Sequence, residues 1–188
     1  MGDTASSGTV IETARLRLRM HRDADLSDLV SQVAPWNVAG WLAALPSPYT
    51  DEHGREWIAH VRQSHAAGHP RAFAIALKET DQLIGGVGLD GTSGDHTDEP
   101  SLGYWLGTSY QGHGYAREAI LAYVFRSLGL DTIRGVTDPE NTPSQNVLIA
   151  CRLRLVGDID LPQPTRRGAR RVPLFCISRH YHTLRIPA

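Results

Sequence analysis

A glycine-rich turn between an apolar strand and a helix constrains this chain more than any other feature of its sequence. Residues 102–106 are predicted to form a strand, GTSYQGHGYA follows at 107–116, and residues 116–128 have helical apolar spacing. Gly112 and Gly114 leave no side chain where the chain enters that helix. The first N–H groups of a helix are free and suit an anion, above all a phosphate. The turn therefore indicates either a phosphate-binding loop or a tight connection without a ligand.

Around this turn, hydrophobic spacing predicts a single domain of mixed α/β or α+β class. Apolar residues three and four positions apart predict helices over residues 26–33, 38–45, 51–67, 116–128 and 142–151. Alternating or continuous apolar runs predict strands over residues 14–20, 72–77, 83–89, 102–106, 132–137, 153–159 and 172–180. The small polar residues 1–11 are expected to be flexible, which leaves residues 12–188 as the domain.

Composition excludes several functional classes. With 188 residues, 19 basic and 20 acidic side chains and a formal net charge of −1, the chain lacks the basic surface that binds nucleic acid through bulk charge. No apolar run approaches the ~20 residues of a membrane helix and the first residues show no signal-peptide pattern, so a cytoplasmic protein is expected. The two cysteines form no CxxC pair and the nine histidines no zinc-ligand spacing, so no metal site is expected.

The glycine-rich turn also resembles a known motif. The pattern Gln111-x-x-Gly114-x-Ala116 is similar to the pyrophosphate loop of the GCN5-related N-acetyltransferases, the GNAT superfamily. Further along, Asn141-x-x-Ser144 resembles the second half-motif of that family. The two motifs follow each other in the family's order, which makes the resemblance more specific than a glycine loop alone.

The resemblance extends over about residues 11–182. Residues 13–19 and 45–50 resemble the branch that acetylates ribosomal-protein N-termini, the RimJ/RimL-like enzymes, whose members are often homodimers. It implies the GNAT acyl-CoA N-acyltransferase fold, a central mixed sheet of about seven strands flanked by helices. In that fold two parallel strands, here 102–107 and 132–137, splay apart where one of them carries a bulge.

The resemblance implies acetyl-CoA, or another acyl-CoA, as the cofactor. Backbone groups of Trp105, Leu106 and Gly107 would pair with the pantetheine amides as a β-strand does. The pyrophosphate would lie on the N–H groups of residues 112–116. The residues expected to bind the cofactor are Trp105, Leu106, Gln111, Gly112, His113, Gly114, Tyr115, Ala116, Arg117, Asn141 and Ser144. Asn141 is also compatible with a turn after Asp138-Pro139.

Two catalytic roles each have an alternative. Family members often carry a glutamate base where this chain has Ser101, and Glu99, two residues earlier, is either that base or an ordinary loop carboxylate. They often use a tyrosine to protonate the leaving thiolate, but Leu148 stands at that place. Ser144 is then the nearest candidate acid, with first-turn helix capping as its alternative.

The acceptor is expected to be a primary amine. A weak base favours an α-amine, whose pKa near 8 leaves roughly 10% neutral at pH 7, over a lysine amine with a pKa near 10.4. Trp36, Asn37 and Trp41 precede a Pro-Tyr turn, where they either line the acceptor groove or belong to a helix core. Three alternatives stay open for the four arginines within residues 166–171: they bind the CoA 3′-phosphate, they bind an acidic substrate, or they face only solvent.

These observations predict an acetyl-CoA-dependent N-acetyltransferase that acts on a protein N-terminus or a small amine by direct attack in a ternary complex. Two alternatives from other classes stay open, a non-catalytic acyl-CoA-binding module and a nucleotide-binding regulatory domain. Preference for CoA over ATP or NAD distinguishes them. No nucleic acid, membrane or metal is expected to take part.

Overall fold

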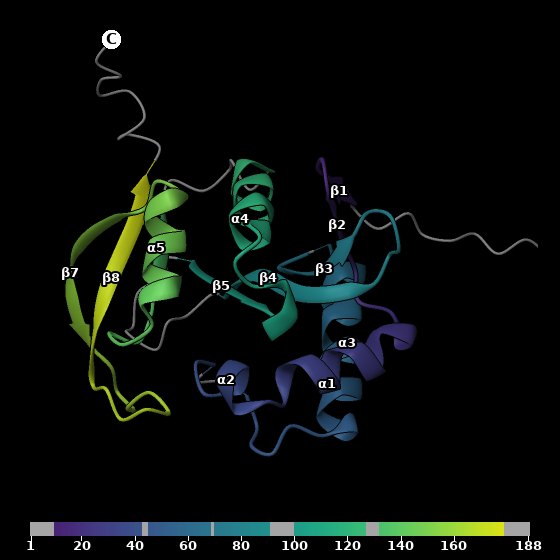
Figure 1. Ribbon diagram of the computed structural model, residues 1–188, viewed down its shortest axis with the longest axis horizontal. Coiled ribbons are helices and arrows are strands. Elements are labelled where there is room, and N and C mark those ends of the chain that lie inside the picture. The colour runs from purple at the N-terminus through teal and green to yellow at the C-terminus, as the bar shows by residue number, and fades with distance from the viewer. Residues whose placement is uncertain (1–9, 43–44, 69, 91–99, 127–131, 179–188) are drawn as a thin grey trace, which may run out of the picture.

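The computed structural model describes residues 10–42, 45–68, 70–90, 100–126 and 132–178. These residues form one eight-stranded sheet in the order β1-β2-β3-β4-β5-β6-β8-β7, one strand more than expected, with helices on both faces (Figure 1). The strands are β1 Ile11–Glu12, β2 Leu16–Arg19, β3 Ala72–Leu77, β4 Leu83–Asp90, β5 Ser101–Leu106, β6 Thr132–Val136, β7 Arg154–Asp160 and β8 Arg171–Ser178. The helices are α1 Leu26–Val33, α2 Trp36–Ala39, α3 Asp51–Ala66, α4 Tyr115–Arg126 and α5 Thr142–Ala150, with short 3-10 turns η1 Asp23–Asp25 and η2 Thr108–Tyr110.

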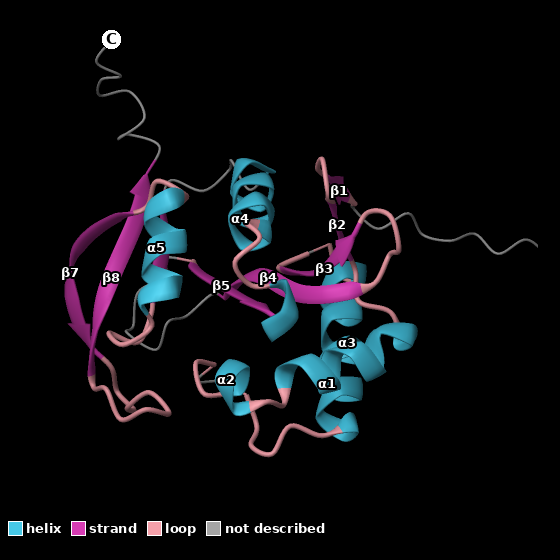
Figure 2. Cartoon of the chain, in the orientation of Figure 1, coloured by secondary structure: helices cyan, strands magenta, loops and turns pink. Residues whose placement is uncertain are grey.

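Two hydrophobic cores cover the two faces of the sheet. Strand β3 shows the reason, because side chains alternate between the faces of a strand. Phe73 and Ile75 pack with residues of α4 and α5, whereas Ala74 packs with residues of α1 and α3. Figure 2 shows these two helix layers on opposite sides of the sheet. A strand buried on both faces is a continuous apolar run, which is the pattern that predicted β3.

Two predicted helices differ from the structure at their ends. The helix expected over residues 38–45 is α2, which begins earlier, after Pro35, and whose last turn is closed by Gly40. The helix expected over residues 116–128 is α4, which is described as far as Arg126, so its predicted end lies outside the described residues. None of the helices in the described ranges combines the length and hydrophobicity of a membrane span.

The sheet opens between the parallel strands β5 and β6. In the described ranges their one register pair is Ser101 with Arg134, beside a 3.0 Å bond from the Arg134 N–H to the Pro100 carbonyl. Beyond that pair no further register pair joins the two strands in the described ranges, which leaves a gap in the hydrogen-bond ladder toward their carboxyl ends. The predicted divergence of these two strands is therefore confirmed.

The bulge lies elsewhere than expected. Between β3 and β4, Ile75 is opposite Gly85 and Ala76 is opposite Leu83, so Ile84 is an extra residue in β4. The expectation of a bulge in one of the parallel strands is thus wrong in its position. A bulge increases the local twist of a strand, and here it lies next to the end of β5 that borders the gap.

Candidate cofactor and acceptor site

The loop between β5 and α4 has the backbone of an anion-binding turn. Gly112 and Gly114 both lie in the left-handed region, with φ angles of 79° and 78°. The first bond of α4 runs from the Glu118 N–H to the Gly114 carbonyl at 3.1 Å, which makes Gly114 the N-cap residue. Glycine has no side chain to cap a helix, so the N–H groups of residues 115–117 have no acceptor within α4. Such a helix start attracts an anion.

Arg15, between β1 and β2, holds this loop against the sheet. Its guanidinium donates from Nη1 to the His113 carbonyl at 3.0 Å and from Nε to Glu118 Oε2 at 2.8 Å. Glu118 also accepts from the Thr13 hydroxyl at 2.6 Å and from the Arg15 N–H at 3.0 Å. Burial raises the pKa of the Glu118 carboxyl, but these hydrogen bonds outweigh it and hold the pKa below its ordinary value. The ion pair therefore holds the peptide group between the two glycines.

The other residues expected at the cofactor loop surround it. Gln111 Nε2 donates to the Leu106 carbonyl at 3.0 Å. The rings of His113 and Tyr115 stack with centroids 5.7 Å apart, and the Arg15 guanidinium lies 4.6 Å from the Tyr115 centroid. The exposed members of the set are Gln111, Gly112, His113, Gly114 and Arg117, whereas Ala116 is buried. The loop thus presents its backbone to solvent while its ends are anchored.

Backbone register decides which groups of β5 face the gap. The Gly107 N–H donates to the Ile84 carbonyl of β4 at 3.0 Å, and backbone groups alternate in direction along an antiparallel strand. Trp105 therefore turns its backbone groups toward β4, and Tyr104 and Leu106 turn theirs toward β6. This register corrects the expectation that the backbone of Trp105 and Gly107 faces the gap, because a strand offers only every second residue to each edge.

Tyr104 spans the distance from β5 to the first turn of α5. Its hydroxyl lies 2.7 Å from Ser144 Oγ and donates to the Ser144 carbonyl at 3.1 Å. The Ser144 N–H donates to Oδ1 of Asn141, the N-cap residue, at 3.1 Å. Burial raises the pKa of the Tyr104 phenol to about 12, against an opposing effect of the Ser144 hydrogen bond. Tyr104 and Ser144 are thus a pair of neutral hydroxyls beside the gap.

Tyr104 is the functional candidate that sequence reasoning missed. The sequence left Ser144 open as an acid or a cap, and the structure shows that Asn141 is the residue that caps α5. One signal in the sequence could have identified it, since Tyr104 stands between two leucines on the same face of the strand. A tyrosine at such a half-buried position carries a hydroxyl that needs a hydrogen-bond partner. That partner lies 40 residues away along the chain, and only the tertiary fold identifies it.

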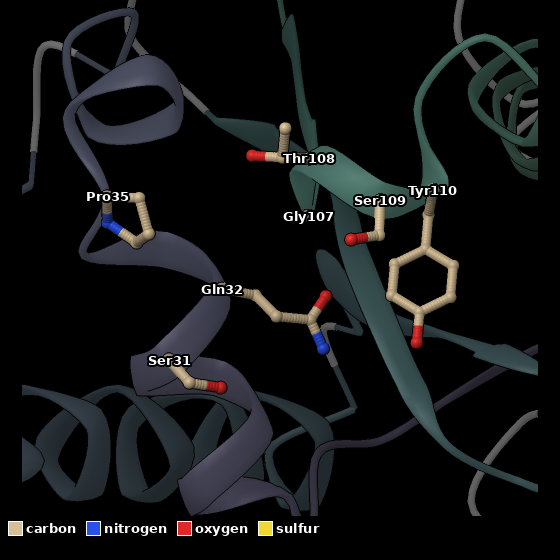
Figure 3. A pocket seen from close by; sticks show the side chains of 7 residues that line it. All are labelled: Ser31, Gln32, Pro35, Gly107, Thr108, Ser109 and Tyr110. Carbon is tan, nitrogen blue, oxygen red and sulfur yellow. The ribbon is translucent and has the colours of Figure 1, made fainter.

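A pocket of about 210 Å³ opens between α1 and the end of β5 (Figure 3) and is lined by Ser31, Gln32, Pro35, Gly107, Thr108, Ser109 and Tyr110. Gln32 Nε2 donates to the Leu83 carbonyl at 2.7 Å, beside the bulge. Its Oε1 is buried and has no hydrogen-bond partner among the described residues. A Cβ atom at Gly107 would lie 2.1 Å from that oxygen, so any other residue here would displace the Gln32 side chain. The pocket provides room for a small polar group next to β5.

The residues expected to line an acceptor groove lie beside this pocket. Asn37 Nδ2 donates to the Thr108 hydroxyl at 2.7 Å, which ties α2 to the residues that follow β5. The Trp36 side chain is 54% exposed, so its alternative as a core residue is wrong. Trp41 is half-buried and lies under the guanidinium of Arg167, 3.7 Å from its ring centroid. The arginine loop thus contacts the region around α2.

The expected base, Glu99, lies outside the described residues. Ser101, which stands where the family often carries its base, is buried and pairs with Arg134 at the closed end of the gap. The described part of the site therefore contains hydroxyl groups and backbone groups around the gap, and a helix start beside it.

Comparisons with known proteins agree with this geometry. Residues 15–154 match the family model of the acetyltransferase (GNAT) domain. The chain is 35% identical over 106 residues to the uncharacterized N-acetyltransferase p20 of Bacillus licheniformis, a match that covers 54% of this chain but only 59% of that protein. A GNAT-family acetyltransferase from Bacillus anthracis superposes with a TM-score of 0.77 at 21% identity, covering 92% of this chain and 99% of that one. RimJ of Mycobacterium smegmatis, solved with CoA-disulfide, has a TM-score of 0.75 at 19% identity, covering 93% and 90%.

Proposed function

The chain belongs to the GNAT acetyltransferases, and we propose that it moves an acetyl group from acetyl-CoA to a primary amine, either the α-amine of a protein N-terminus or a small amine. One observation carries the proposal. The uncapped start of α4 meets the part of the β5 edge that has no register pair with β6 at the same end of the sheet (Figure 1). CoA has a charged pyrophosphate and an amide-bearing arm, and each finds a partner of fitting chemistry there.

We assign two parts of the cofactor, its pyrophosphate and its pantetheine arm, to two groups of backbone atoms. The pyrophosphate is placed on the N–H groups of the first turn of α4 and of Gly112 and Gly114, whose positive φ angles turn the backbone toward it. We place the pantetheine amides against the backbone of Tyr104 and the N–H group of Leu106, which face the gap, since the Leu106 carbonyl already accepts from Gln111. The complex of M. smegmatis RimJ with CoA-disulfide, in the same fold, supports CoA as the cofactor of this chain.

The chemistry requires no protein nucleophile. Acetyl-CoA supplies a thioester, the amine nitrogen bonds to its carbonyl carbon, the C–S bond breaks, the amine loses a proton and the sulfur gains one. We assign Tyr104 and Ser144 to the sulfur. A phenol with a pKa of about 12 is a weaker acid than a thiol with a pKa near 8.5, so the pair acts mainly as a hydrogen-bond donor to the departing thiolate.

An α-amine acceptor follows from the weak basicity of the described site. Among the described residues, hydroxyl and backbone groups border the gap, and the Asp138 carboxylate beyond β6 already accepts from Thr165 and the Glu140 N–H. A substrate with a fraction of neutral amine at pH 7 needs least help from a base. The pocket beside Gln32 and α2, on the opposite side of β5 from Tyr104, is the proposed entry for that amine. The sequence resemblance of residues 13–19 and 45–50 to the RimJ/RimL-like branch favours a protein N-terminus over a small amine.

Parallel thermal melts with acetyl-CoA, CoA, ATP and NAD test the cofactor, followed by an acetyl-transfer assay with N-terminal peptides and small amines. A ligand at 100 times its Kd adds roughly 2.7 kcal/mol, on the order of 5–10 °C for a domain of this size. A rise with acetyl-CoA and CoA alone, together with transfer, is the expected result. A rise without transfer to any amine would favour a non-catalytic acyl-CoA module, and a rise with ATP or NAD instead would favour a nucleotide-binding domain.

A further inference from the structure

An arginine-bearing loop meets the exposed end of α2. It connects β7 to β8 and reaches toward α2 in Figure 1. Arg166 Nε donates to the Leu42 carbonyl at 3.0 Å. The Arg167 guanidinium lies 3.7 Å from the Trp41 ring centroid and 5.9 Å from that of Trp36. These two arginines and two tryptophans form a surface that is called the basic rim below.

The loop is held in place by its own hydrogen bonds. Thr165, the residue before the two arginines, donates from its hydroxyl to Asp138 Oδ2 at 2.6 Å and from its N–H to the Ala169 carbonyl at 2.8 Å. The base of the loop is closed by a 2.7 Å bond from the Leu161 N–H to the Arg170 carbonyl. The arginines of the rim are therefore positioned before any ligand binds, which lowers the entropy cost of recognition.

Two anchor points place the basic rim at the open end of the gap. Asp138, which holds Thr165, lies two residues after β6. Thr108, which holds Asn37 of α2, lies two residues after β5. The rim is thus tied to the carboxyl ends of the two diverging strands. An acceptor that enters by the pocket beside Pro35 and Thr108 therefore approaches the gap from the side on which the rim lies.

The rim keeps its positive charge. Among the described residues, Arg166 and Arg167 contact a carbonyl oxygen and two indole rings and form no ion pair with a carboxylate. The nearby Asp138 is already engaged, since it accepts from Thr165 and from the Glu140 N–H at 2.9 Å. A guanidinium stacked on an indole still has N–H groups at its edges that can bind a carboxylate in a two-pronged contact.

We propose that the basic rim recognises carboxylates that follow the acceptor amine, so that this chain prefers protein N-termini with acidic residues at positions two to four. The inference rests on the proposed function and names its substrate class. An extended peptide advances ~3.3 Å per residue, so those positions lie within about 10 Å of the amine. The exposed Trp36 ring offers an apolar face to the same peptide. The sequence left the CoA 3′-phosphate and an acidic substrate as alternative ligands of the arginine loop, and this proposal chooses the acidic substrate.

Paired peptides test the inference. Each pair has the same first residue and carries either glutamate or glutamine at positions two to four, and kcat/KM is measured at saturating acetyl-CoA. The wild-type chain is expected to prefer the acidic peptide by about tenfold or more at low salt, with the preference falling at high salt. Arg167→Gln and the double variant Arg166→Gln/Arg167→Gln are expected to reduce the preference to less than about threefold, mainly by lowering kcat/KM for the glutamate peptide.

Two matched variants separate recognition from general effects. Arg170→Gln removes an exposed charge from the same loop and is expected to keep the preference. Arg167→Lys is expected to retain only part of it, because the charge remains but the two-pronged contact and the stacking on Trp41 are lost. Thermal melts confirm that each variant is folded. Equal rates for the two peptides in the wild type, or an equal loss in Arg170→Gln, would overturn the inference and leave the acetyltransferase proposal intact. Transfer to small amines but to no peptide would overturn the inference and the N-terminal acceptor together.

Discussion

The two helices that follow the diverging strands begin in opposite ways. α5 begins at Asn141, whose side chain accepts the Ser144 N–H at 3.1 Å, and Pro143 in its first turn has no N–H to satisfy. α4 begins at Gly114, which has no side chain, after the left-handed Gly112. One helix satisfies its first turn from within the chain, and the other leaves its first turn to a ligand. A helix start becomes an anion site only where the chain leaves it uncapped.

Helix α1 has a third kind of beginning, because it continues from the 3-10 turn η1 and the Asp25 side chain at the junction is held in an ion pair and caps no N–H group of α1. Asp25, at its start, accepts from the Arg22 N–H at 2.8 Å and from the buried Arg19 guanidinium at 2.7 and 2.8 Å. Burial raises the pKa of the Asp25 carboxyl, but these bonds outweigh it and hold the pKa below its ordinary value. The three helices thus begin with an open backbone, a neutral cap and an ion pair, and each responds differently to change.

The largest effect is expected from damage to the open start of α4. In Gly114→Val a β-branched residue must adopt a φ of 78°, and its Cβ lies 3.6 Å from Arg15 Nη2. Relief of this strain displaces the loop, so the Kd for acetyl-CoA is expected to rise by about 100-fold, measured by calorimetric titration.

A matched glycine controls for strain alone. Gly68, at the end of α3, has a φ of 81° and open space around its Cβ position. Gly68→Val is expected to lose stability without losing affinity for acetyl-CoA. Wild-type affinity in folded Gly114→Val would contradict the assignment of the pyrophosphate to this loop.

The second effect concerns the hydroxyl pair at the start of α5. Tyr104→Phe keeps the ring but removes the hydroxyl that contacts Ser144 at 2.7 Å. We expect kcat to fall by about 30-fold and the Kd for acetyl-CoA to change by less than about threefold, because the hydroxyl acts on the departing thiolate. Tyr123→Phe is the control, since the Tyr123 hydroxyl donates to the Arg71 carbonyl at 2.8 Å and lies in the core. A similar fall in kcat in both variants would point to a structural role for Tyr104.

The third effect is a pH dependence of stability, expected from His21 beside the charged start of α1 and not from the neutral starts of α4 and α5. His21 is 1% exposed, and burial lowers its pKa from 6.5 to about 4, although Asp25 opposes the shift. The unfolded chain takes up a proton below pH 6.5 that the folded chain does not, so stability present at neutral pH is lost as the pH falls toward 4. Because of His21, we expect the free energy of unfolding to fall by about 2 kcal/mol when the pH is lowered from 7 to 5.

Urea unfolding at several pH values measures this loss. His21→Phe keeps a ring against Trp57, whose centroid lies 6.2 Å away, and is expected to flatten the pH dependence. His60→Gln, at an exposed position on α3, is expected to leave it unchanged. An equally steep loss in His21→Phe would assign the acid sensitivity to other groups, with the Arg19–Asp25 pair as the first to examine.

The smallest effect is expected from opening the capped start of α5. Asn141→Ala removes the acceptor of the Ser144 N–H and is expected to lower the free energy of unfolding by about 1 kcal/mol, whereas Asn141→Asp keeps a cap. Urea unfolding at pH 7 measures both variants. If the alanine variant is as stable as the wild type, the cap contributes little and the contrast between the two helices is one of geometry alone.

Local chemistry explains the parts of the site that could be predicted. The positions of β3, β5 and α5 followed from apolar runs, and the glycines of the phosphate loop followed from their place between a strand and a helix. The bulge at Ile84 could not be predicted in this way, because β4 shows the same glycine-rich apolar pattern with or without an extra residue. The short α2 was predicted too long for a similar reason, since apolar spacing continues beyond Gly40 although the helix does not.

By itself, the sequence determined the order of elements, the uncapped helix start and the family to which the chain belongs. Each of these depends on residues that are close neighbours in the chain, where spacing translates directly into geometry. Only the tertiary structure decided that Tyr104 meets Ser144, that the edge of β5 facing the gap belongs to Tyr104 and Leu106, and that the arginine loop lies against α2. Those contacts join segments that are 40 or more residues apart or depend on a strand's register, and both are set when the two hydrophobic cores close on the sheet.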